Sequence, residues 1–154
     1  MRRLITAASL TAAIVLGSTG AAHASEGSNT HCYQGNRAYG AKICVKEDWY
    51  HGDSWKSDKV KVHTIKYYPK YDSTAAKKRT QSISVTGPTI SKKEGYWYSD
   101  IVYTGNDFSL TAKNPTRTVH PNVTVPRNYV FSFSFQIRKS TAKDSYGSPE
   151  FKVG

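Results

Sequence analysis

Apolar and polar side chains alternate with a period of two along most of the chain after residue 38. The clearest run is residues 129–138, whose alternate members are Tyr129, Phe131, Phe133, Phe135 and Ile137. Strict alternation marks an extended strand with one face in a core and the other in water. Shorter runs of the same kind occupy residues 41–46, 60–64, 82–86 and 108–112. Each of these runs predicts a strand that is buried on one side only.

Two further segments predict strands of a different character. Residues 96–103 are apolar on both faces, with Trp97 and Ile101 on one side and Tyr98 and Val102 on the other. A strand that is apolar on both faces is expected in the centre of a sheet. Residues 120–126 carry two valines between two prolines, a pattern that favours an edge strand or a sheet boundary.

Turn residues separate these runs at short intervals, and no amphipathic helical stretch exceeds two turns. The strongest turn signals are His51-Gly52-Asp53, Gly87-Pro88, Lys93-Glu94-Gly95, Gly105-Asn106-Asp107 and Asn114-Pro115. Residues 75–80 favour at most a brief helical turn. The sequence therefore predicts an all-β fold, an antiparallel β-sandwich of immunoglobulin-like or jelly-roll-like type with about seven to eight short strands.

The first residues have the three parts of a secretory signal peptide. Arg2 and Arg3 give a positive start, residues 4–20 are apolar or small, and Ala22-His23-Ala24 fits the signal peptidase rule. A membrane anchor is the alternative, but the apolar run is shorter than the about 20 residues that span a bilayer. We therefore expect residues 1–24 to be cleaved and the mature chain to be secreted, extracellular and without a transmembrane segment. The alanine-rich leader indicates a bacterial source.

Two cysteines, Cys32 and Cys44, predict one disulfide in an oxidising compartment. Nearby His31 and His51 raise the alternative of a metal site, but their spacing is irregular and lacks close ligand pairs. If the alternate apolar residues of 41–46 face inward, Cys44 faces outward. The bridge is then expected to hold residues 25–38 over the outside of that strand.

The mature length suits one domain with its own core. We expect an N-terminal segment over residues 25–38 that the disulfide holds, and a sandwich domain over residues 39–138. Residues 139–154 are expected to form a polar tail or a last short strand.

The chain is strongly basic, with 22 Lys and Arg against 11 Asp and Glu and a net charge of +11. Such a charge supports contact with a polyanion or simply keeps a protein soluble. The most basic stretch is Lys77-Lys78-Arg79, expected in a loop close to tyrosines. Cations beside planar rings suit an anionic or carbohydrate polymer. The predicted binding residues are Lys77, Lys78, Arg79, Tyr71, Trp55 and Trp49, with nucleic acid not expected as the main partner.

No sequence motif indicates a catalytic activity. A nucleophilic serine needs a base and an acid that orients it, but the four histidines after residue 24 stand apart and Gly52-Asp53-Ser54 fits a hairpin turn. No catalytic residue, metal or cofactor is expected. The first hypothesis is therefore a non-enzymatic binding module. The alternatives are an inhibitor that offers the basic loop to an extracellular protease, and a hydrolase or toxin without a recognisable motif.

Overall fold

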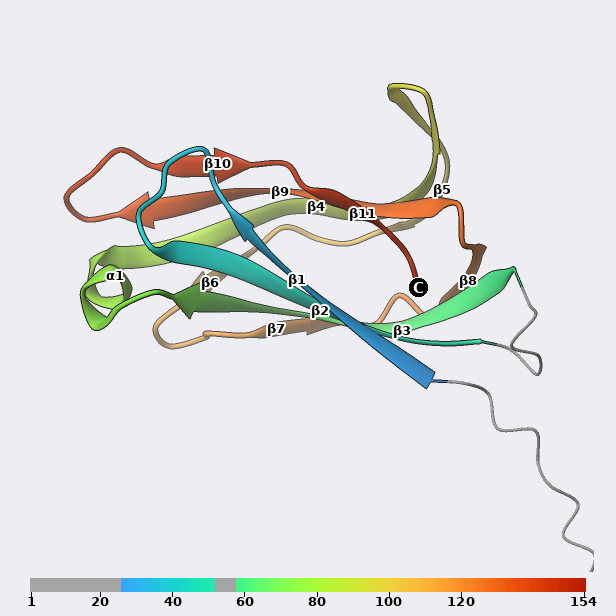
Figure 1. Cartoon of the computed structure of the whole chain (residues 1–154), viewed down its shortest axis with the longest axis horizontal. Coiled ribbons are helices and arrows are strands. Elements are labelled where there is room, and N and C mark those ends of the chain that lie inside the picture. Colours follow the sequence, from blue (N-terminus) through green and yellow to red (C-terminus); the bar gives the residue numbers. More distant parts are fainter. Residues whose placement is uncertain (1–25, 52–57) are drawn as a thin grey trace, which may run out of the picture.

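Two antiparallel β-sheets lie face to face and enclose one core (Figure 1). The structure is a computed structural model that describes residues 26–51 and 58–154. Sheet A follows the order β1-β2-β3-β7, with β8 also paired to β3. Its strands are β1 (Glu26–Gln34), β2 (Ala41–His51), β3 (Lys59–Tyr71), β7 (Arg117–Val119) and β8 (Val123–Pro126).

Sheet B follows the order β10-β9-β4-β5, with β6 paired to β4 and β11 paired to β9. Its strands are β4 (Thr80–Glu94), β5 (Trp97–Thr104), β6 (Phe108–Thr111), β9 (Tyr129–Lys139), β10 (Ser145–Gly147) and β11 (Glu150–Lys152). One short helix, α1 (Thr74–Arg79), joins β3 of sheet A to β4 of sheet B. Within residues 26–51 and 58–154, no helix has the length and apolar character needed to cross a membrane.

The core is built from the inward residues that the alternation predicted. Four alternate residues of β9 are buried, namely Phe131, Phe133, Phe135 and Ile137. Tyr67 on β3 packs across the interface between the sheets, with its ring centroid 5.6 Å from that of Phe133. The predicted all-β antiparallel sandwich with one disulfide is therefore confirmed.

The predicted number of strands is wrong, because the described residues form eleven strands rather than seven to eight. β1 escapes the pattern because its sequence is largely polar. β7, β10 and β11 have three residues each, which is too short for an alternation to be visible. The segment 139–154 thus contributes two short strands, and it buries Phe151 and Val153.

The disulfide joins neighbouring strands rather than holding a segment over the sheet. Cys32 of β1 lies directly opposite Cys44 of β2 in the antiparallel register. Residues 26–34 therefore extend sheet A at its edge, and the expectation that they cover its outer face is wrong. Backbone pairing with β2 explains the difference, because it satisfies the polar groups that an overlying segment would leave open. His31 and Tyr33 point inward and stack on Phe151.

The placement of residues 96–103 also differs from the prediction. β5 forms the edge of sheet B and pairs only with β4. Its apolar residues are exposed on both faces instead of being buried, except for Tyr103, which packs partly buried against the core. The strand is apolar on both faces as predicted. This pattern does not by itself decide whether neighbouring strands cover those faces.

Candidate functional site

Four lysines gather on the outer face of sheet A, and we call them the lysine face. Lys42 and Lys46 lie on β2, and Lys66 and Lys70 lie on β3. The register places Lys42 directly opposite Lys70, and Lys46 directly opposite Lys66. The alternate positions of both strands are buried in the core, so these lysine side chains point to solvent.

Directly opposed residues of an antiparallel pair have Cβ atoms about 5 Å apart, and like charges there destabilise the sheet. Acidic residues offset two of the four charges. Asp72 lies 3.4 Å from the Lys42 ammonium, and Asp48 lies 2.9 Å from that of Lys46. Neither Lys66 nor Lys70 forms an ion pair with a residue that the structure describes. Each opposed pair therefore keeps one uncompensated cation.

The carboxylate of Asp48 is held in its charged form. Burial acts to raise its pKa, but hydrogen bonds from Lys46, Thr64 and Ser28 outweigh burial and lower the pKa below its ordinary value. The Thr64 hydroxyl donates one of these bonds over 2.9 Å. Asp48 therefore continues to neutralise Lys46 at the acidic end of the physiological range. The uncompensated positive charge stays on Lys66 and Lys70 of β3.

Tyr68 lies between the two lysine pairs. It is directly opposite Cys44, so that one aromatic ring and the disulfide separate the Lys42·Lys70 pair from the Lys46·Lys66 pair. Tyr68 is half-buried, whereas Cys44 opposite it is fully buried. A planar ring surrounded by ammonium groups offers stacking and charge at one place.

A groove of about 600 Å³ begins at Tyr68 and continues around the edge of β3. It forms there because β7 pairs with β3 only as far as Tyr67, leaving the last residues of β3 without a neighbour on that side. Its lining includes Tyr68, Tyr71, Lys77, Leu110 and Pro115. Pro69 also lines it and lacks a backbone N–H, which suits a free edge. The groove and the lysine face therefore share Tyr68.

The basic cluster at residues 77–79 lies on α1 and not in a loop. The hydroxyl of Ser73 accepts a hydrogen bond of 3.1 Å from the N–H of Ala76 and so caps the helix. Ala76 is buried and fixes the helix against the sandwich. This cap and contact explain why a stretch too short to predict as helix is helical here. The basic side chains are exposed, and Lys77 reaches the groove.

The structure brings together only some of the predicted binding residues. Tyr71 and Lys77 line the same groove, with Lys78 and Arg79 exposed beside it on α1. Trp55 lies outside the described residues. Trp49 pairs with Val62, nine residues along β3 from Tyr71, a separation of about 30 Å at about 3.3 Å per residue. Trp49 packs partly buried against the core at that distant position.

The lysine face was not predicted, although part of its pattern is visible in the sequence. Every one of its lysines occupies an outward position of a strand. On β2 one lysine lies on each side of the buried Ile43 and Val45, and on β3 one lies on each side of the inward Tyr67 and Pro69. Alternation alone predicts that they share the outer face of their own strands. Only the register between β2 and β3 shows that they oppose one another.

Outside the lysine face, Ser28, Asp48 and His63 line one pocket on sheet A, and the ring centroid of His63 lies 6.3 Å from that of His120. Among the described residues, no group of three or more His, Cys, Asp or Glu side chains could hold a metal ion. The ring of His63 forms a hydrogen bond of 2.9 Å with Asn122, and His31 stacks on Phe151. The turn Gly52-Asp53-Ser54 falls outside the described residues.

Comparison with protein-family models, with curated proteins and with solved structures found no match for this chain. A fold of this kind hosts many unrelated functions. Function therefore has to be inferred from the geometry and charge of the site.

Proposed function

We propose that this protein is a secreted, non-enzymatic binding module that holds an anionic polymer of a cell surface or extracellular matrix on its lysine face. The observation that supports this most strongly is the pair of directly opposed lysine couples on either side of Tyr68. Asp72 and Asp48 offset one lysine of each couple. Lys70 and Lys66 therefore each keep a positive charge that an anion can neutralise.

The arrangement fits a chain of repeated charges better than a single small anion. The two lysine couples are four residues apart along each strand, which is about 13 Å in an extended backbone. One small anion cannot bridge that distance, whereas sulfate, phosphate or carboxylate groups along a polymer can. Release of counterions from such a polymer adds to the affinity and makes it depend on salt.

The groove gives the polymer a place for a sugar ring. Tyr68 and Tyr71 supply aromatic surface, and Lys77 supplies a cation at the same groove. Aromatic rings next to cations hold planar or ring-shaped groups by stacking. An anionic polysaccharide meets both requirements, because its charges match the lysines and its rings match the tyrosines.

Secretion is part of the proposal. The signal-peptide pattern of residues 1–24 predicts export. The Cys32–Cys44 disulfide is compatible with an oxidising compartment outside the cytoplasm. The lack of a membrane-spanning helix among the described residues is compatible with it too.

The helical conformation of the basic cluster weakens the proteinase-inhibitor alternative. An inhibitor of the expected kind offers an extended loop, but Lys77, Lys78 and Arg79 lie in a helix. A panel of secreted proteases tests it directly, and inhibition at stoichiometric concentrations would revive it. The hydrolase or toxin alternative would have to use the pocket that Ser28, Asp48 and His63 line together. Assays on polymer substrates, with His63→Ala as the comparison, test it.

Replacing Lys66 and Lys70 by alanine is expected to weaken binding to heparin, used as a model anionic polysaccharide, by about tenfold or more. The slope of log affinity against log salt is expected to fall by about two, one for each lost contact. Affinity chromatography and titration at several salt concentrations measure both quantities.

The matched control replaces Lys143 and Lys152, which are exposed lysines associated with sheet B. This variant loses the same net charge without touching the lysine face. If both double variants lose affinity equally, only the overall charge matters and the proposed site is wrong.

The Tyr68→Ala variant is expected to bind the same polymer about tenfold more weakly while keeping the salt slope, because stacking is lost and no charge changes. Isothermal titration at two salt concentrations separates these effects. The Tyr146→Ala variant removes another exposed aromatic ring, on β10, and serves as the control. An unchanged affinity for Tyr68→Ala would remove the tyrosine from the site.

A further inference from the structure

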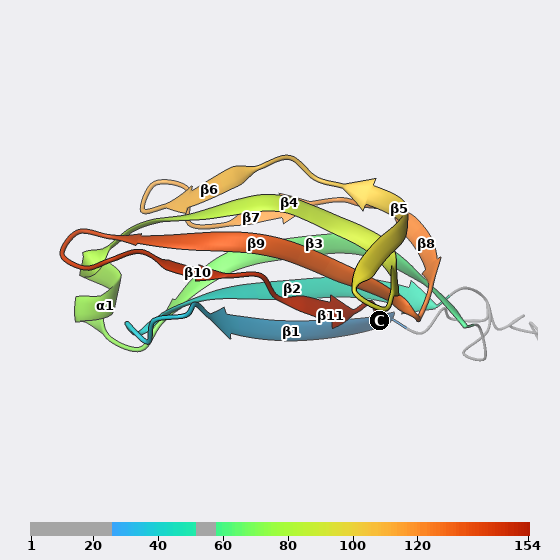
Figure 2. The same cartoon turned by 90° about the horizontal axis from the view of Figure 1, so that it is seen from above.

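The hairpin that joins β4 to β5 carries most of the exposed apolar surface of the described chain. Seven large apolar residues are exposed in that part, and five of them lie on this hairpin: Tyr96, Trp97, Tyr98, Ile101 and Val102. Tyr96 is 95% exposed and Trp97 is 82% exposed. The hairpin leaves the plane of sheet B at the end of the molecule opposite α1 (Figures 1 and 2). Concentrated apolar exposure of this kind marks a contact surface.

The tip of the hairpin is ordered by its own backbone pairing. Glu94 pairs with Trp97, and Lys93 pairs with Tyr98. Gly95 lies between them with φ of +62°, the left-handed conformation that a two-residue hairpin turn requires at its first central position. The tip therefore presents Tyr96 and Trp97 on a pre-formed turn, so little conformational entropy is lost on contact.

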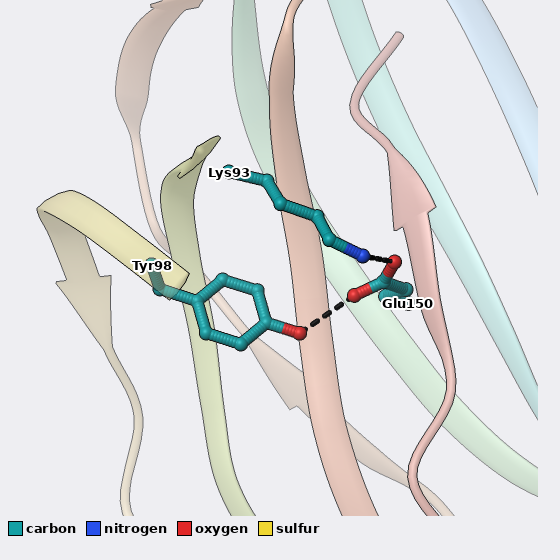
Figure 3. A network of polar contacts seen from close by, with 3 residues as sticks. All are labelled: Lys93, Tyr98 and Glu150. Carbon is teal, nitrogen blue, oxygen red and sulfur yellow. Dashed lines mark hydrogen bonds and ion pairs between the residues drawn. The ribbon is translucent and has the colours of Figure 1, made fainter. Parts of the chain in front are cut away.

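A polar clamp near the tip fixes the hairpin to the rest of sheet B (Figure 3). The Lys93 ammonium pairs with Glu150 on β11, and the Tyr98 hydroxyl donates a 2.6 Å hydrogen bond to the same carboxylate. These two donors lower the pKa of Glu150 below its ordinary value. Lys92 pairs with Glu94 in the same region. The two glutamates near the tip are thus neutralised and do not repel an anionic surface.

Strand addition by a second copy or by an extended peptide is disfavoured at this hairpin. The register between β4 and β5 shifts between Ile90 and Lys92. Within the shifted part of β5, Asp100 adopts φ of +48° and exposes its carboxylate. A bulge and a charge on an edge strand are features that prevent pairing with another strand. The apolar side chains, and not the strand edge, are therefore the contact surface.

The side chains of the tip match a membrane interface. Tyrosine and tryptophan prefer the boundary between water and lipid, where a ring with one polar group is stable. Ile101 and Val102 add aliphatic surface, which sugar stacking does not use. Lys92 and Lys93 lie close to the turn, but Glu94 and Glu150 balance their charge, so the hairpin itself is not cationic. The excess of 22 Lys and Arg over 11 Asp and Glu in the whole chain attracts the molecule to an anionic surface.

We propose that the β4–β5 hairpin docks the protein on anionic phospholipid bilayers, with Tyr96 and Trp97 entering the interface. Only the tip enters, because the open edge of β5 carries backbone groups that hydrocarbon cannot satisfy. This contact is separate from the lysine face, which lies on the outer side of sheet A. The two surfaces would allow the protein to hold a polymer while it rests on a membrane.

The test compares the full chain with the Tyr96→Ser/Trp97→Ser variant on vesicles of phosphatidylglycerol and phosphatidylcholine. Both proteins keep the same first 25 residues, so a difference between them isolates the hairpin. Sedimentation is expected to show about tenfold weaker partitioning of the variant. Brominated lipid is expected to quench part of the tryptophan fluorescence of the unmodified protein. The Trp97→Phe variant is expected to lack that quenched part. The control Tyr146→Ser is expected to partition like the unmodified chain.

Three results would overturn the proposal. The first is equal partitioning of the full chain and the hairpin variant. The second is equal partitioning of the full chain on anionic vesicles and on pure phosphatidylcholine. The third is a dimer in solution that the Trp97→Ser substitution dissociates, because that result would assign the hairpin to a second copy. Heparin binding measured on the same variants distinguishes failure of the hairpin from failure of the lysine face.

Discussion

Replacing Glu47 by leucine is expected to stabilise the protein increasingly as the pH rises from 4 to 8. Glu47 lies on the inward face of β2 and is fully buried. One carboxyl oxygen accepts a long hydrogen bond of 3.5 Å from the N–H of Gly154, and the other has no partner within the described chain. Burial of an ionised carboxylate under these conditions is costly.

The pKa of Glu47 determines the direction of the effect. Burial, opposed by the hydrogen bond from Gly154 and reinforced by the charge of Asp48, raises this pKa from 4.5 to about 7. The folded protein therefore binds the proton more tightly than the unfolded chain does. The unfolding free energy that depends on Glu47 is largest below pH 4.5, falls as the pH rises toward 7, and is constant above that. The shift corresponds to about 3 kcal/mol of unfolding free energy.

Denaturant unfolding followed at several pH values measures this effect. The difference in unfolding free energy between Glu47→Leu and the unmodified protein is expected to grow by about 3 kcal/mol from pH 4 to pH 8. Comparison at each pH cancels the titration of all other groups. Asp48→Asn is the control with the opposite sign, because the lowered pKa of Asp48 stabilises the folded state above the ordinary pKa of the group. Parallel pH profiles of the Glu47→Leu variant and the unmodified protein would show that Glu47 does not titrate in this range.

Removing the disulfide with Cys32→Ala and Cys44→Ala is expected to lower the unfolding free energy by about 3 kcal/mol in the chain-entropy model. The bridge closes a loop between residues 12 apart and joins β1 to β2. Alanine is chosen at residue 44 because this position is fully buried, and a serine hydroxyl there would be left without water.

Thermal and denaturant unfolding of the double variant measure the loss relative to the oxidised unmodified protein, and the reduced unmodified protein is expected to show a similar loss. Heparin affinity provides a second readout, because Cys44 lies directly opposite Tyr68 in the middle of the lysine face. We expect the folded double variant to bind heparin more weakly, since the disulfide next to the tyrosine ring is lost. An unfolding free energy equal to that of the oxidised protein would show that β1 is held by backbone pairing alone.

The sequence contained enough information to predict the sandwich and its core. Phe131, Phe133 and Phe135 are buried as their alternation required, because burial of one face is the main local determinant of a strand. β1 could not be predicted in this way. Its polar residues are held in place by pairing with β2 and by the disulfide, and neither contact leaves an alternation in the sequence.

The candidate site was less predictable because it depends on which strands become neighbours. Lys77 and Tyr71 were identified from local charge and aromatic content, and they line one groove. The opposition of Lys66 to Lys46 arises only from the register of β3 against β2. The neighbours of β5 could not be predicted either, and most of its apolar residues are exposed because no strand or sheet covers them.

The pairing of β4 with β9 governs the order in which the molecule is assembled. These strands form the centre of sheet B, and their register joins Lys92 to Tyr129 and Thr80 to Lys139. Contacts between such distant residues form slowly, because a long loop must close first. Sheet B therefore cannot close until residues 129–139 have been synthesised. Under the proposed secretion, this delay keeps the chain unfolded while it passes through a narrow export channel.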